Sequence, residues 1–148
     1  MSIGKNISAP GPITLIGGDT TINGNLIASN VGQGITIKSR GYISFADNIT
    51  LQTAGGSAAK IVVWTSSGGV AGGYISVGNR ICINTQGSCV SPTETGGADI
   101  ILGGGSSGTT APTGAALGGA NTSIQFGSGA YGVKKVYSGG GNVSFKGT

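Results

Sequence analysis

The chain of 148 residues contains no histidine and only 12 charged residues. Without imidazole, neither a histidine-ligated metal site nor a Ser-His or Cys-His nucleophile can form. We expect the four carboxylates, Asp19, Asp47, Glu94 and Asp99, to lie in separate structural units. A paired general acid and base is therefore not expected. We predict a protein that is not an enzyme, with no catalytic residue, cofactor or metal site.

Long uninterrupted segments are also missing. Glycine supplies 32 residues, and the longest glycine-free run, Tyr42–Ala54, has 13 residues and alternates between apolar and polar side chains. This excludes long helices, coiled coils and transmembrane helices. The hydrophobic share of 37% with a net charge of only +4 argues against disorder. We predict a folded, all-β chain.

Neither a basic cluster nor a secretory leader is evident. The eight basic residues are scattered, so we expect no nucleic-acid partner. The first residues, Met1–Asn6, lack a charged segment followed by an apolar one. Because abundant Ser, Thr, Asn and Gly with few charges are typical of secreted repetitive β-structure, we expect an internal piece of a secreted protein, without membrane insertion.

Short alternating apolar triplets recur along the chain, and each predicts a very short strand. The triplets are Ile13–Leu15, Ile35–Ile37, Ile43–Phe45, Ile49–Leu51, Ile61–Val63, Ile75–Val77, Ile81–Ile83, Ile100–Leu102, Ile124–Phe126 and Val143–Phe145. Three residues are too few for an independent hairpin, and the spacings vary. Stacked parallel strands are therefore favoured over an antiparallel meander.

An internal repeat strengthens this interpretation, since residues 42–53 align without a gap on residues 74–85. The alignment places Ile on Ile, Phe45 on Val77 and Leu51 on Ile83, which predicts inward columns of a solenoid. The segments 46–48 and 78–80 are predicted bends, where Asn, Asp and Gly tolerate left-handed backbone angles.

The predicted architecture is a right-handed parallel β-helix with Gly-rich corners, one domain over residues 1–148. We take the triplets beginning at residues 35, 61, 100, 124 and 143 as equivalent, with intervals of 26, 39, 24 and 19 residues, and add a first coil around Ile13 and Ile22. This gives about six coils, with a corner insertion at residues 86–94. Unpaired strands at both ends predict a tendency to stack end to end.

Several glycine-flanked units resemble the repeats of large bacterial exoproteins of the filamentous haemagglutinin type. They are the runs Gly72–Gly78, Ile83–Thr85 and Gly96–Gly105, and the tail Gly139–Thr148, which resembles the "GGGN-apolar-polar-apolar-x-GT" ending of those repeats. The resemblance covers about residues 35–148. It implies a secreted parallel β-helix that acts as an adhesin, a toxin stalk or a matrix filament.

The function expected from these observations is mechanical. We expect part of an extracellular rod, adhesin or filament at a bacterial surface, with a second copy of itself or neighbouring coils as partners, or host-cell or glycan receptors. The alternative is a carbohydrate-binding or carbohydrate-cleaving β-helix. An ice-binding solenoid is disfavoured, because the outward positions form no regular threonine array.

Two further groups of residues are candidates for a role. Cys82, at an outward position, and Cys89, in the insertion, could form a disulfide that ties the insertion to the wall of its own coil; two free thiols or metal binding are the alternatives. Tyr42, Trp64 and Tyr74 occupy outward positions of the alternating pattern and could contact sugars. For Trp64 we favour coverage by the loop Thr65–Gly73.

Overall fold

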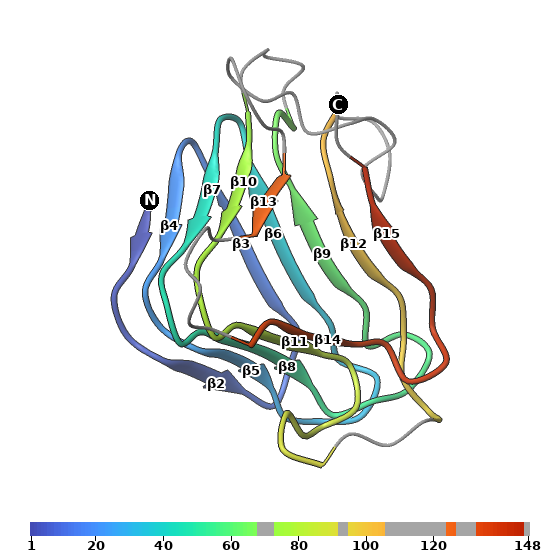
Figure 1. The fold of residues 1–148 in the computed structure, drawn as a ribbon. Coiled ribbons are helices and arrows are strands. Elements are labelled where there is room, and N and C mark those ends of the chain that lie inside the picture. The colour runs from blue at the N-terminus through green and yellow to red at the C-terminus, as the bar shows by residue number, and fades with distance from the viewer. Residues whose placement is uncertain (68–72, 92–94, 106–123, 127–132, 147–148) are drawn as a thin grey trace.

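The computed structural model describes residues 1–67, 73–91, 95–105, 124–126 and 133–146. Every regular element in these ranges is a β-strand. The 15 strands form three parallel sheets of five strands each, which face one another as three walls (Figure 1). Within the described ranges there is no helix long and apolar enough to cross a bilayer. The fold is the predicted all-β parallel β-helix.

Each coil of the β-helix contributes one strand to each of the three sheets. Sheet A contains β1 (Ser2–Ile3), β4 (Thr20–Ile22), β7 (Ile43–Phe45), β10 (Ile75–Val77) and β13 (Ile124–Phe126). Sheet B contains β2 (Ile7–Ala9), β5 (Leu26–Ala28), β8 (Thr50–Thr53), β11 (Cys82–Asn84) and β14 (Lys135–Tyr137). Sheet C contains β3 (Ile13–Gly17), β6 (Ile35–Ser39), β9 (Ile61–Trp64), β12 (Ile100–Gly103) and β15 (Val143–Phe145). We number the coils 1 to 5, so that coil 1 is β1–β3 and coil 5 is β13–β15.

The predicted repeat is confirmed in register. Ile75 pairs with Ile43 and Val77 with Phe45 in sheet A, while Ile83 pairs with Leu51 in sheet B. The inward side chains of these strands are buried and belong to one hydrophobic cluster that runs through the solenoid. Alternation explains the strands, because every second side chain enters this cluster and the others face outward.

The coil count and one column of the prediction are wrong. The described strands make five coils, where about six were predicted. Ile124 pairs with Ile75 in sheet A and so does not belong to the sheet C column. Ile13 belongs to that column, whereas Ile22 lies in coil 2. The sheet C column therefore begins at residues 13, 35, 61, 100 and 143. An Ile-x-Phe triplet suits any of the three walls, so its composition cannot assign it to one.

The predicted bends after β7 and β10 do have left-handed residues at the same position of each coil. Asn48 has a φ of 62° and Arg80 a φ of 53°. Close approach of the coils also requires glycine in this bend, because a Cβ at Gly78 would lie 2.6 Å from the carbonyl group of Ala46. Asn occupies the left-handed region more readily than Arg does.

These equivalent positions give a matched pair of substitutions. Arg80→Asn should raise the free energy of unfolding by about 0.5–1 kcal/mol, because it relieves an unfavourable backbone angle. Asn48→Arg should lower it by a similar amount. Urea unfolding followed by circular dichroism measures both; equal stabilities of the two variants would contradict the explanation.

Candidate functional site

The most regular polar feature is a set of five Asn and Asp side chains at the coil corners, which we call the corner ladder. Each side-chain Oδ1 accepts a hydrogen bond from a backbone N–H of the next coil. The acceptor and donor pairs are Asn6 and Asn25 (2.8 Å), Asn25 and Thr50 (2.9 Å), Asp19 and Tyr42 (3.2 Å), Asp47 and Asn79 (2.7 Å), and Asp99 and Asn142 (3.0 Å).

Register explains why these bonds recur. The strands that follow Asp99 and Asn142 pair Ile100 with Val143, so acceptor and donor occupy the same position of successive coils. The same relation holds for the other four pairs. A side chain of this length reaches the N–H group stacked directly above it, where no strand partner is available. The corner ladder therefore satisfies backbone groups at the points where the sheets end.

The described carboxylates are kept apart by this arrangement. Asp19 precedes β4, Asp47 lies in the bend after β7, and Asp99 precedes β12, so they belong to coils 2, 3 and 4. Glu94 lies outside the described residues. In the part of the chain that the structure describes, no three His, Cys, Asp or Glu residues gather where they could hold a metal ion. Each of the three described carboxylates thus serves as a hydrogen-bond acceptor for a backbone N–H group.

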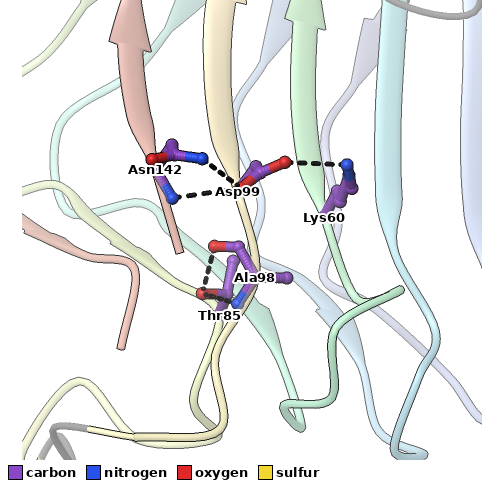
Figure 2. A network of polar contacts seen from close by, with 5 residues as sticks. All are labelled: Lys60, Thr85, Ala98, Asp99 and Asn142. Carbon is purple, nitrogen blue, oxygen red and sulfur yellow. Dashed lines mark hydrogen bonds and ion pairs between the residues drawn. The ribbon is translucent and has the colours of Figure 1, made fainter. Parts of the chain in front are cut away.

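Asp99 is the most connected member of the corner ladder (Figure 2). Its Oδ2 lies 2.7 Å from Nζ of Lys60 in the coil below, and its Oδ1 accepts from both the backbone and the side-chain nitrogen of Asn142 in the coil above. The hydrogen bond from Lys60 and that from the Asn142 backbone hold the pKa of Asp99 below its ordinary value. One carboxylate therefore links three successive coils.

Buried hydroxyl groups support the same corner from inside. Oγ1 of Thr85 accepts the N–H of Ala98 at 3.0 Å and lies 3.0 Å from the carbonyl oxygens of Ala98 and Ser138 (Figure 2). Thr53, one coil earlier, donates to the carbonyl of Ala59 at 3.0 Å. Both threonines are fully buried. Because a buried carbonyl without a partner is costly, these hydroxyls stabilise the turn from sheet B to sheet C.

The two cysteines are joined in the structure. The disulfide connects Cys82 on the outward side of β11 to Cys89, with 6.1 Å between their Cα atoms. Asn84 closes the same loop, since its Oδ1 accepts the N–H of Gln86 at 2.5 Å and its Nδ2 donates to the carbonyl of Ser88. Val90, next to the disulfide, is 88% exposed. This corner between β11 and β12 is longer than the one between β8 and β9, and the disulfide fixes its first half to the wall.

The three candidate aromatics differ in exposure. Tyr42 and Tyr74 stack on the outer side of sheet A, with ring centroids 5.2 Å apart and planes within 13°. Tyr42 is half-buried and Tyr74 is 36% exposed. Trp64 is not a surface aromatic, because it is only 1% exposed. Its Nε1 donates to the carbonyl of Gly105 at 2.9 Å, and Nζ of Lys38 lies 4.7 Å from the ring centroid.

Comparisons of the chain with known protein families, curated proteins and solved structures give no match. The function must therefore be argued from the geometry. Sequence analysis assigned Asp47 to a bend and missed the corner ladder as a whole. A signal was present, because an Asn or Asp stands directly before the strands at Asn6, Asn25, Asp19 and Asp99.

The Lys60–Asp99 pair gives a pH-dependent prediction. A lowered folded-state pKa contributes stability above the unfolded-state pKa of about 3.9, and this contribution is lost as the pH falls through the folded value. Asp99→Asn should therefore cost up to about 1 kcal/mol at pH 7, as expected for a partly exposed ion pair. The difference between the variant and the parent chain should shrink as the pH is lowered below the unfolded-state pKa of about 3.9.

Urea unfolding at pH 7 and over a series of acid pH values measures this difference. Asp47→Asn is the matched control, because it keeps an acceptor for Asn79 and Asp47 has no ion pair among the described residues. A loss at Asp99 that stays the same at acid pH would contradict the electrostatic explanation.

The disulfide gives a second prediction. Closing a loop of this size restricts the unfolded chain, so reduction should lower the free energy of unfolding by about 2 kcal/mol. The double substitution Cys82→Ser and Cys89→Ser should match the reduced chain. Hydrogen exchange should accelerate at Gly87 to Val90 and stay unchanged at β8. Unaltered exchange in the loop after reduction would show that the other bonds alone hold it.

Proposed function

We propose that this chain is a structural segment of an extracellular bacterial rod, adhesin or filament, of the kind found in filamentous haemagglutinin-type exoproteins. Its role is to hold neighbouring binding regions at a distance, and it has no active site of its own. The fold suits this role, because stacked coils add length along one axis while each coil contacts only its neighbours.

The observation that carries the proposal is the use made of the polar side chains. The described carboxylates, Asp19, Asp47 and Asp99, each accept a backbone N–H from the following coil. The fully buried hydroxyls of Thr53 and Thr85 likewise bind corner carbonyls. Groups that would serve chemistry in an enzyme are thus engaged in joining coils, which favours a mechanical role.

The Cys82–Cys89 disulfide supports a secreted or cell-surface location, because such bonds persist in oxidising compartments. The partners we propose are further coils or copies of the chain, together with host-cell or glycan receptors. The basic residues are scattered along the sequence, in keeping with a role without nucleic acid, and insertion into a membrane forms no part of the proposal.

A carbohydrate-binding or carbohydrate-cleaving β-helix is the second candidate. The stacked Tyr42 and Tyr74 favour it, since partly exposed aromatic rings on a polar wall are suited to contacts with sugars. Ser44 and Ser76 follow on the same wall, one stacked on the other. In this case the tyrosine pair and its neighbouring hydroxyls would form the binding surface.

Single-molecule pulling between the two ends tests the mechanical proposal. A load-bearing rod should resist and then lengthen in force peaks, with gains that correspond to whole coils at about 3.6 Å per released residue. Extension without any force peak would overturn it.

A glycan array and a polysaccharide-depolymerisation assay test the alternative. Saturable glycan binding that Tyr74→Ala abolishes, with Ser76→Ala as the neighbouring control, would favour the second candidate. The structural proposal expects no released oligosaccharide and no dependence of mechanical resistance on Tyr74.

A further inference from the structure

The end face of coil 5 exposes residues whose counterparts in coils 2 to 4 are buried. Val143 and Phe145 are 45% and 47% exposed, whereas Ile100 and Leu102, the residues beneath them, are fully buried. Phe126 packs edge-on against Phe145, with centroids 5.3 Å apart. Among the described strands, β13, β14 and β15 each have a partner on one side only. Coil 5 therefore presents the face that each earlier coil presents to its successor.

The backbone N–H groups of this face point away from the preceding coil. In sheet C, the N–H of the first inward residue of each strand donates to a carbonyl of the next coil: Ile13 to Gly34, Ile35 to Lys60, Ile61 to Asp99, and Ile100 to Asn142. Val143 is the next residue in this series. Its N–H is therefore directed away from coil 4, toward the position of a following coil.

Coil 1 carries the complementary face. Its inward residues Ile3, Ile7 and Leu15 are half-buried and pack against the core cluster from the other end. They are of the same class as the residues above them in each column. The column through Leu15, for instance, continues with Ile37, Val63, Leu102 and Phe145. A coil 1 placed on coil 5 would thus continue apolar columns without a polar interruption.

We propose that coil 5 of one copy binds coil 1 of a second copy, head to tail, and continues the parallel sheets across the junction. This deepens the proposed structural function, on which it rests, by naming the partner and the contact. The register is that of the four coil junctions inside the chain, so the N–H of Val143 donates to the carbonyl of Pro12 as that of Ile100 donates to Asn142. Proline is compatible with this place, because it offers a carbonyl there and leaves no unpaired N–H.

The opposite arrangement, coil 5 against coil 5, is disfavoured by charge. Coil 5 carries Lys134, Lys135 and Lys146 and no acidic residue among its described positions. Two such faces would bring six lysines together around one junction, whereas the head-to-tail junction places coil 1, with Lys5 as its single lysine, against them. A head-to-tail contact is also heterologous, so it repeats into an open filament.

Val143→Lys tests the contact, because a lysine there puts a charge on the exposed apolar face while it changes little that is buried in the monomer. Ser144→Lys is the matched control on the outward side of the same strand. In sedimentation velocity and negative-stain electron microscopy, the parent chain and Ser144→Lys should form concentration-dependent filaments. Val143→Lys should associate at least tenfold more weakly, with an unchanged circular dichroism spectrum.

Mixing resolves the direction of the contact. The Val143→Lys chain keeps an intact coil 1, so it should join the coil 5 end of a parent filament and stop its growth. Substoichiometric addition should therefore shorten parent filaments. Filaments that keep their length in this mixture would overturn the head-to-tail direction, as would equal association of the Val143→Lys and parent chains.

A parent chain that stays monomeric up to its solubility limit would overturn the self-docking proposal altogether. That result would leave the pulling experiment unaffected, because mechanical resistance is measured on one chain. The failure of the contact and the failure of the structural function are thus distinguishable.

Discussion

In-register parallel stacking is the constraint on which the rest of this molecule depends. Neighbouring strands in a sheet lie about 4.8 Å apart, so each side chain meets the residue at the same position one coil below. An inward column is accordingly built mainly of apolar residues, as in the series Ile13, Ile35, Ile61, Ile100 and Val143. The same spacing forces glycine into corners where backbone meets backbone, as at Gly78.

Stacking also explains the scarcity of charge. Corners are the points where strand hydrogen bonds stop, and backbone groups there need other partners. Short polar side chains supply them, either from outside, as Asp47 does for Asn79, or from inside, as Thr85 does for Ala98. Long charged side chains are poorly suited to such short distances. The Lys60–Asp99 pair is an exception that serves the same end, because it links successive coils on the outer side.

The sequence was sufficient to predict the fold wherever two coils repeat closely. The alignment of residues 42–53 on residues 74–85 predicted the pairing of Phe45 with Val77 and of Leu51 with Ile83 correctly. The prediction failed where the corners differ in length, since Ile124 could be assigned to the wrong wall without any conflict of composition. Trp64 shows a second limit. Alternation assigns it to the outer side, but it is buried and contacts Lys38 and Gly105, which are distant in the sequence.

The corner ladder could have been predicted only in part. Asn or Asp before an apolar triplet is visible in the sequence, but the acceptor's partner belongs to the next coil and depends on the register. The separation of partners ranges from 19 residues for Asn6 and Asn25 to 43 for Asp99 and Asn142. A local pattern contains no information on such a distance until the coils have been matched.

Unequal corners have a consequence for how such a protein can change over generations. The step from Ile13 to Ile35 takes 22 residues and the step from Ile100 to Val143 takes 43, yet both advance the stack by one strand in the same register. Inserted sequence thus leaves the stacking register of the strands unchanged. New surface features can be acquired at a corner without re-optimising the core, and whole coils can be duplicated to lengthen the molecule in fixed increments.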